Sequence, residues 1–221
     1  MLKQGLLTCL TILLLSSCNT LQIIDKPITY DEERKQLSLD YLEKRYGIIK
    51  TEPSIEPRMV VVHWTAIPDF EKSFDAFKPS KLPNTRPDIT DASALNVSAQ
   101  FLVDQNGKIY RLLPETTMAR HVIGLNHCAI GIENVGGTTD MPLTEKQLKS
   151  NIKLIKHLKE KFPKIDYVIG HFEYTHFEDH PLWLEIDKGY RTEKTDPGKD
   201  FIDTIRKSTG NLNWEPVPDK S

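Results

Sequence analysis

The stretch Met59-Val60-Val61-Val62-His63 decides the fold, because it is a continuous apolar run with three consecutive valines. A run of β-branched residues without polar alternation is typical of a strand buried on both faces of a sheet. The histidine that closes the run would stand where the sheet holds a side chain rigidly but leaves it open to a ligand. The sequence therefore predicts a central strand with His63 at its open end.

Segments on both sides of this run predict the other strands and the helices. Strands are expected at 98–103 and 108–113, paired as a hairpin around Asp104-Gln105-Asn106-Gly107, and at 129–133 and 168–169. Helices are expected at 31–46 and 144–162, from Pro68 onward with Phe70, Phe74 and Phe77 on one side, and around Phe201, Ile202 and Ile205. Strands separated by helices indicate a single α/β domain with a central mixed β-sheet flanked by helices.

The two longest predicted helices each show an apolar side that we expect to face the core. Their apolar residues are Leu37, Leu39, Leu42 and Tyr46, with Gly47 ending the helix, and Leu148, Ile152, Ile155 and Leu158. The segment 79–96 contains three prolines and little periodicity. We interpret it as a loop that is long enough to suggest a function in binding.

The N-terminus predicts export and a lipid anchor. Lys3 precedes an apolar run from Gly5 to Leu15, which is too short to span a bilayer because that requires about 20 residues. Leu15-Ser16-Ser17-Cys18 resembles the bacterial lipobox, in which the cysteine is lipidated; an ordinary signal peptide is the alternative. Asn19 is not the aspartate that favours inner-membrane retention. We therefore expect a lipid-anchored, exported protein of the cell envelope, at the outer membrane or in the periplasm of a Gram-negative bacterium.

The chain is expected to divide into four parts. These are a signal peptide (1–17), a tether with the first helix (18–57), the α/β domain (58–208) and a polar tail (209–221). The net charge of −2 gives no electrostatic reason to expect nucleic acid, and we expect a monomer. Because Cys9 leaves with the signal and Cys18 is lipidated, Cys128 has no intrachain disulfide partner. The core and, on this view, a metal hold the domain together.

Three side chains form a candidate metal site. His63 and His171 each follow a predicted strand, and Asp196 lies in Lys194-Thr195-Asp196-Pro197-Gly198. In that stretch the proline favours an extended conformation and the glycine permits a turn. Two imidazoles and a carboxylate are the ligand set of a zinc site with an open position for water. The sequence thus predicts that His63, His171 and Asp196 bind Zn²⁺.

Two further residues fit a reaction at such a metal. Glu133 ends the strand 129–133 on the face opposite Ile130 and Ile132, where a carboxylate is costly unless it is paired or used. We expect it to accept a proton from an attacking water. Lys194 is expected to stabilise an oxyanion that develops on a carbonyl. The alternatives are an N-capping or rim carboxylate for Glu133 and a surface ion pair for Lys194 with Asp196.

An ordered set of motifs supports this interpretation. The motifs are HWT (63–65), SAQFLVDQNGKIYRLLPE (98–115), ARH (119–121), GLN (124–126), AIGIENVGG (129–137), GH (170–171) and KTDPG (194–198). The chain from Arg58 to Phe201 resembles the zinc-dependent type 2 N-acetylmuramoyl-L-alanine amidases, whose superfamily includes phage amidases and peptidoglycan recognition proteins. The resemblance implies that residues 58–208 are a zinc amidase domain of that fold.

The resemblance also implies residue roles and a reaction. The matching residues are His63, His171 and Asp196 as zinc ligands, Glu133 as the water-activating glutamate, Lys194 as the lysine near the oxyanion, and His121 and Asn126 as substrate-groove residues. The implied reaction is hydrolysis of the amide between N-acetylmuramic acid and L-alanine in peptidoglycan or muropeptides. The alternatives are a non-catalytic peptidoglycan-binding protein of the same fold and a zinc peptidase acting within the stem peptide. Binding alone needs neither a metal nor a base, whereas the peptidase would use the same metal chemistry.

Three features depart from the family pattern or suggest another chemistry. Gln100 stands where the family commonly has a histidine, which leaves its role open. The segment 172–193 is longer than usual and adds His176 and His180, which we expect in a surface loop near the substrate rather than in a second metal site. Cys128 is expected to be buried packing rather than a thiol nucleophile.

Overall fold

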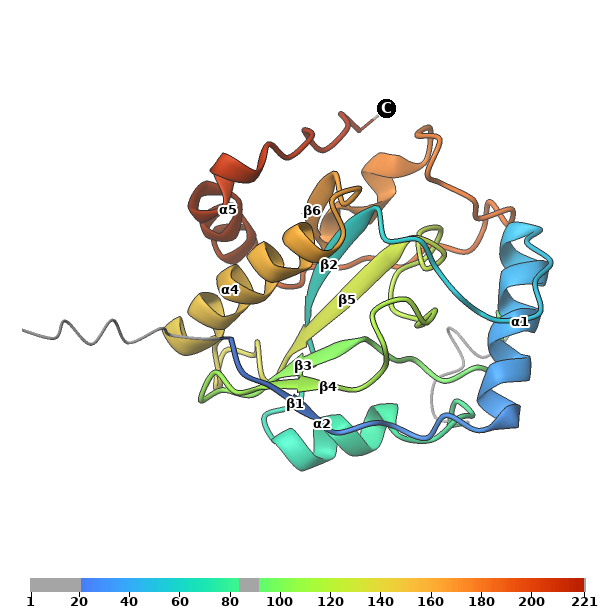
Figure 1. Cartoon of the computed structure of the whole chain (residues 1–221), viewed down its shortest axis with the longest axis horizontal. Helices are drawn as coiled ribbons and strands as arrows, with labels where there is room; N and C mark the ends of the chain where they lie inside the picture. The colour runs from blue at the N-terminus through green and yellow to red at the C-terminus, as the bar shows by residue number, and fades with distance from the viewer. Residues whose placement is uncertain (1–20, 84–91, 221) are drawn as a thin grey trace, which may run out of the picture.

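The computed structural model describes residues 21–83 and 92–220, so the predicted signal peptide and Cys18 lie outside it. The strands are β1 (Ile23–Asp25), β2 (Met59–Trp64), β3 (Phe101–Val103), β4 (Ile109–Arg111), β5 (Ala129–Asn134) and β6 (Tyr167–Gly170). The helices are α1 (Glu32–Tyr46), α2 (Phe70–Phe77), α4 (Glu145–Lys161) and α5 (Lys199–Ser208), with 3-10 turns η1 (His171–Phe177) and η2 (Gly210–Leu212). Figure 1 shows the sheet at the centre with the helices around it.

The six strands form one mixed sheet in the order β1-β4-β3-β5-β2-β6. The pair β3 and β4 is antiparallel, and the other neighbours are parallel. Strand β2 pairs with β5 on one side and β6 on the other, and Met59 to His63 are all buried. This confirms the predicted central strand and the α/β class with a mixed sheet.

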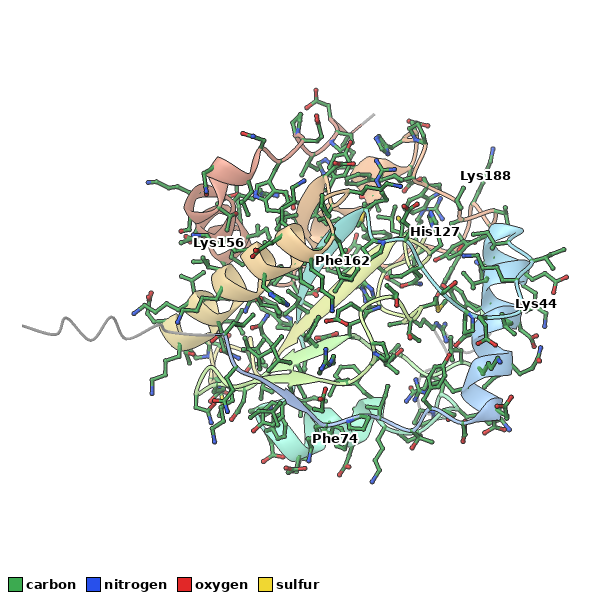
Figure 2. All side chains as sticks on the ribbon, in the orientation of Figure 1. Lys44, Phe74, His127, Lys156, Phe162 and Lys188 are labelled. Atoms are coloured by element: carbon green, nitrogen blue, oxygen red, sulfur yellow. The ribbon has the colours of Figure 1, made fainter. Side chains whose placement is uncertain are left out.

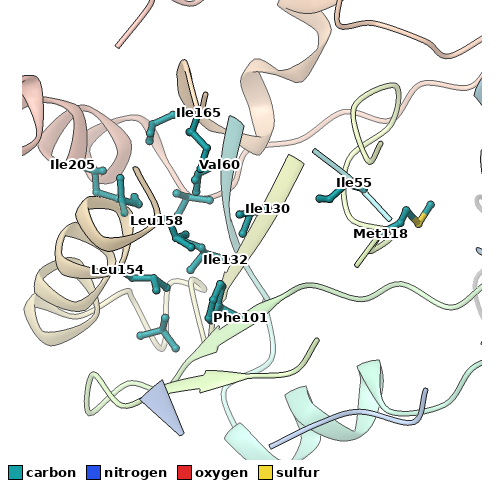
Figure 3. Close-up of a cluster of buried hydrophobic side chains, with 14 of the residues drawn as sticks. Ile55, Val60, Phe101, Met118, Ile130, Ile132, Leu154, Leu158, Ile165 and Ile205 are labelled. Carbon is teal, nitrogen blue, oxygen red and sulfur yellow. The ribbon is translucent and has the colours of Figure 1, made fainter. Parts of the chain in front are cut away.

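Helices α4 and α5 cover one face of the sheet and form the main core there (Figure 3). Val60, Ile130 and Ile132 from the sheet pack with Leu154 and Ile205 from the two helices. Truncating a buried leucine or isoleucine in such a cluster costs about 2–5 kcal/mol. The core therefore fixes β2 and β5, whose ends carry the polar residues on the opposite face.

The predicted apolar residues of α1 and α4, apart from Leu39, belong to the main core or pack against it, but the buried side of each helix also includes polar residues. In α1 the buried residues are Arg34, Ser38, Tyr41, Leu42 and Tyr46, and Leu37 and Leu39 are half-buried. In α4 the buried residues are Gln147, Asn151, Leu154, Ile155 and Leu158, and Leu148 and Ile152 are half-buried. The polar members make specific hydrogen bonds: Arg34 donates to the carbonyl oxygens of Phe77 and Pro79. Buried polar groups with such partners are tolerated, so the buried side of each helix is less apolar than the prediction.

Several boundaries also differ. Within the predicted tether at the start of residues 18–57, Ile23–Asp25 pair with β4 as an edge strand that was not expected. Helix α2 starts at Phe70 because the Asp69 side chain, and not Pro68, caps it by accepting from the Lys72 amide. The predicted hairpin is confirmed, but its strands β3 and β4 are shorter than expected, with Val103 and Ile109 as register partners beside the turn. Part of the loop 79–96 lies outside the described residues, and its described ends are bridged at Lys81 and Leu95.

The C-terminal tail packs against the domain. Trp214 donates its indole N–H to Thr209 Oγ1 at 2.9 Å, and the Lys159 ammonium lies 5.4 Å from the indole ring.

Within residues 21–83 and 92–220 we find no helix that is both long and apolar enough to cross a membrane. Figure 2 shows exposed lysines on the outer surfaces of two helices, for example Lys44 on α1 and Lys156 on α4.

Candidate metal centre and its cavity

Neighbouring strands bring the two predicted histidine ligands together. Val62 of β2 is the register partner of Gly170 of β6. His63 and His171 are the residues that directly follow these two partners in the chain. Asp196, the third residue, is held near the two histidines by a backbone hydrogen bond: the Phe172 amide donates to the Asp196 carbonyl oxygen at 3.1 Å. His63 and His171 are 108 positions apart in the sequence, and His171 and Asp196 are 25 positions apart. All three converge at one end of the sheet.

The three side chains form a nearly equilateral triangle. His63 Nδ1 lies 3.0 Å from His171 Nδ1 and 3.2 Å from Asp196 Oδ2, and the last two atoms are 3.1 Å apart. Ligand atoms about 2.0–2.1 Å from a tetrahedral zinc are about 3.3–3.4 Å from one another. The exposed fractions of the three residues are 1%, 7% and 7%. The donor set, spacing and burial therefore fit a zinc ion.

The protonation states of the site also suit a metal. Burial, followed by the neighbouring His63, lowers the pKa of His171 to about 4. Burial alone would raise the pKa of Asp196, but the neighbouring His171 outweighs it and holds that pKa well below its usual range. Metal binding requires a neutral imidazole and an ionised carboxylate. The fold provides both at neutral pH.

The two predicted reaction residues lie beside this triangle. Glu133 on β5 is the register partner of His63 on β2, so their side chains leave the same face of the sheet. Glu133 is 8% exposed, and Lys194 is half-buried two residues before Asp196. Glu133 and Lys194 line one cavity of about 320 Å³, together with the three residues of the triangle. A cavity of this size accepts a small organic ligand or part of a larger one.

Other lining residues were not singled out from the sequence. They include Tyr41 of α1, Trp64 and Thr65 after His63, Arg120, Tyr190 and Thr192. The only sequence signal for any of them was adjacency to a motif, as in HWT and ARH. Tyr41 and Tyr190 reach the cavity through long-range packing, which no local pattern reports.

The two predicted substrate-groove residues also line the cavity. Asn126 is buried, and its Oδ1 accepts the amides of His121 and Val122 at 2.8 Å each. Its Nδ2 donates to the Tyr46 hydroxyl at 3.1 Å. Asn126 therefore holds the backbone that carries His121, and contact of either side chain with a substrate stays a prediction.

The residues with doubtful roles have clear structural partners. Gln100 accepts the Gly131 amide at 2.7 Å and donates to the Thr117 carbonyl oxygen at 2.8 Å. His176 contacts the Pro218 carbonyl oxygen and His180 the Tyr167 hydroxyl. Among the described residues, the one His/Cys/Asp/Glu group that could hold a metal is the triangle, so the two histidines form no second site. Burial raises the pKa of Cys128 to about 12, which rules out an activated thiolate there.

The long segment after η1 packs on α1 beside the cavity. Glu185 is fully buried and pairs with Arg45 at 2.7 Å. The Trp183 ring covers Gly124, where a Cβ atom would fall 2.5 Å from it. The Tyr190 hydroxyl accepts from Arg120 at 3.1 Å. This segment thus forms a wall of the cavity together with α1.

These features define an α/β domain with a buried His-His-Asp centre, a neighbouring glutamate and a ligand-sized cavity. Residues 53–199 match the family described as N-acetylmuramoyl-L-alanine amidase, and the chain belongs to this family. Helix α1 lies outside the matched range yet contributes Tyr41 to the cavity.

Similar proteins agree with this assignment. The 1,6-anhydro-N-acetylmuramyl-L-alanine amidase AmpD of Haemophilus influenzae is 30% identical over 127 residues, which cover 51% of this chain and 68% of that protein. The solved N-acetylmuramoyl-L-alanine amidase LysC of Clostridium intestinale has a TM-score of 0.52 at 20% identity, covering 89% of this chain and 100% of its own. Bumblebee PGRP-SA has a TM-score of 0.50 at 20% identity, covering 89% and 99%. At these identities the two structures establish the shared fold.

Proposed function

We propose that this protein is a zinc-dependent N-acetylmuramoyl-L-alanine amidase that hydrolyses the amide between N-acetylmuramic acid and L-alanine in peptidoglycan or muropeptides. The observation that carries the proposal is the triangle of His63 Nδ1, His171 Nδ1 and Asp196 Oδ2. Its sides of 3.0–3.2 Å are slightly shorter than the edge of about 3.3–3.4 Å in a tetrahedral zinc site. Membership of the amidase family and the name of the Haemophilus influenzae relative support the choice of bond.

Each residue at the site has one task in this reaction. Zinc at the triangle would lower the pKa of a water molecule and polarise the amide carbonyl. Glu133 accepts the proton of the attacking water and delivers it to the leaving nitrogen. Lys194 places a positive charge where the carbonyl oxygen becomes negative. The buried position of the ligands keeps bulk water away from these charges and so strengthens their effect.

Digestion of purified muropeptides tests the proposal. The full chain is loaded with zinc and given muropeptides with reducing or 1,6-anhydro sugars, and the products are read by mass spectrometry. The amidase releases a stem peptide beginning with L-alanine and a sugar with a free lactyl carboxylate. Alanine left on the sugar would identify a stem peptidase instead. Binding without any product would identify a recognition protein.

We also propose that the protein is exported and held at a membrane of the cell envelope through a lipid on Cys18. The support is the sequence Leu15-Ser16-Ser17-Cys18 after a short apolar run. Mass spectrometry of the membrane-extracted protein should show a mature N-terminus at Cys18 with an added acyl mass. The Cys18→Ala variant should lack that mass and keep the catalytic activity of the domain. A mature N-terminus at another residue, without acyl mass, would contradict the anchor.

A further inference from the structure

We propose that His121 is a positioning residue that fixes which ring nitrogen of His63 carries the hydrogen. In this arrangement the lone pair of His63 Nδ1 faces the candidate zinc position. The inference rests on the zinc site of the proposed function and gives His121 a role distinct from contact with substrate. It follows from a chain of contacts that starts at a backbone carbonyl and ends at the ligand triangle.

The first contact determines the tautomer of His121. Its Nε2 lies 3.3 Å from the carbonyl oxygen of Ala129, and a carbonyl can only accept a hydrogen bond. His121 Nε2 therefore carries a hydrogen. In a neutral imidazole only one of the two ring nitrogens carries a hydrogen. Its other nitrogen, Nδ1, then presents a lone pair.

The second contact passes this constraint to His63. His63 Nε2 lies 3.0 Å from His121 Nδ1, and the two rings meet edge to face at an interplanar angle of 88°. Because His121 Nδ1 accepts, His63 Nε2 must donate. In the neutral ring of His63 the lone pair is then on Nδ1, which is the atom in the triangle.

The consequence is an arrangement that favours a cation. The Nδ1 lone pair of His63 faces a carboxylate oxygen of Asp196 at 3.2 Å, and two acceptors at this distance repel each other. A cation held by His63 and Asp196 would relieve this repulsion. An imidazole whose outer nitrogen is hydrogen-bonded is also a better oriented ligand.

The surrounding residues are arranged to hold the His121 ring in place. A Cβ atom at Gly131 would fall 2.9 Å from ring carbons of His121, so this position on β5 has room for the ring because it is glycine. Gln100 fixes the Gly131 amide, and Asn126 accepts the His121 amide at 2.8 Å. Both ring nitrogens of His121 are engaged by the protein. A substrate that reaches this ring would therefore meet its carbon atoms.

The first test is the tautomer of His63 in the metal-free, full-length wild-type protein. With ¹⁵N-labelled histidine, long-range imidazole spectra distinguish a nitrogen that carries hydrogen from one that does not. The His63 signals are assigned by their loss in His63→Gln. We expect hydrogen on Nε2 and a bare Nδ1. A spectrum with hydrogen on His63 Nδ1 would overturn the proposal without any variant of His121.

The second test is zinc affinity, measured by competition with a coloured chelator. His121→Phe keeps a ring of similar size without nitrogens, and we expect about 10–100-fold weaker binding. His121→Asn can place an oxygen near the Nδ1 position and should recover most of the affinity. Gly131→Ala should weaken binding by displacing the ring. Wild-type affinity in His121→Phe, with an unchanged His63 tautomer, would contradict the proposal.

These readouts are separate from the proposed reaction. If wild-type protein binds zinc with the expected His63 tautomer and cuts no muropeptide, the proposed function fails and the role of His121 stands. If the amidase reaction occurs and His63 carries hydrogen on Nδ1, the role of His121 fails and the proposed function stands. Circular dichroism of each variant establishes that it folds, and the wild-type spectrum decides the question for any variant that does not.

Discussion

His63 and Glu133 are register partners on the adjacent parallel strands β2 and β5. One ladder of the sheet therefore sets the distance between a candidate metal ligand and the candidate proton acceptor. Both strands are anchored on the opposite face by the apolar contacts of α4 and α5 (Figures 1 and 3). Sites built on packed strands hold their geometry better than sites built on loops.

Replacing the carboxylate ligand should remove the metal. Asp196 Oδ2 contacts both imidazoles, so Asp196→Asn keeps the shape of the site and loses its negative charge. Two imidazoles alone make a weak site, and we expect most of the zinc to be lost. Elemental analysis of the purified chain measures zinc per protein. Asp203→Asn, at an exposed carboxylate on α5, is the control and should keep one zinc. Full zinc content in Asp196→Asn would place the third ligand elsewhere.

Removing the proton acceptor should leave the metal in place. Glu133→Gln has the same size but cannot take a proton, so the rate of muropeptide cleavage should fall about 10²–10⁴-fold. Because Glu133 lies beside the triangle without belonging to it, zinc content should match wild type. Steady-state rates and elemental analysis on one preparation check both statements. Wild-type turnover in this variant would exclude Glu133 as the base.

The buried ion pair between the long segment and α1 should matter for stability. The Glu185 side chain is fully buried and that of Arg45 is 12% exposed, so Glu185→Gln leaves the Arg45 cation only its longer contact with the more exposed Asp187 at 3.4 Å. We expect the free energy of unfolding to fall by about 3 kcal/mol in urea titrations. Glu56 pairs with Lys164 at the surface, and Glu56→Gln should cost much less because exposed ion pairs contribute little to stability. Equal losses of unfolding free energy in the two variants would show that the buried pair contributes no more to stability than the surface pair.

Acid should destabilise the protein partly through His127 (labelled in Figure 2), whose ring packs against that of Tyr46 at the end of α1. Burial, followed by the charge of Lys50, lowers the pKa of His127 from 6.5 to about 4. Between these values the unfolded chain binds a proton that the folded chain does not. Stability is therefore complete above about pH 6.5 and is lost as the pH falls toward 4.

The variant His127→Gln isolates this contribution. Its stability should fall less steeply with decreasing pH, by up to one proton or about 1.4 kcal/mol per pH unit. Urea titrations of both proteins between pH 8 and pH 4 give the two slopes. Identical slopes would mean that His127 does not exchange a proton on unfolding.

The sequence predicted the elements whose signals are local. The valine run of β2, the helix end at Gly47 and the turn before β4 depend on neighbouring residues, and each was confirmed. The candidate triangle was also foreseeable, because its histidines follow strands and Asp196 lies before a proline and a glycine. Strands that end at the same edge of a sheet bring such residues together.

The remaining features depend on contacts between distant segments. Strand β1 has three residues and exists because β4 offers it a parallel edge. Arg34 is buried on α1 because carbonyl oxygens at the end of α2 accept its hydrogens. His121 meets His63 across 58 residues of sequence, over a glycine that makes room for its ring. No hydrophobic period or short motif reports such pairings.

The most direct test of the amidase account is the position of solvent oxygen in the products. Muropeptide is digested by the zinc-loaded protein in H₂¹⁸O, and the sugar and peptide are weighed separately by mass spectrometry. Hydrolysis of the amide to L-alanine must place one ¹⁸O in the lactyl carboxylate of the sugar and none in the peptide. We predict that result, and its disappearance in Glu133→Gln on the same time scale. Label in the carboxylate of alanine, or no cleavage by wild-type protein with bound zinc, would contradict the account.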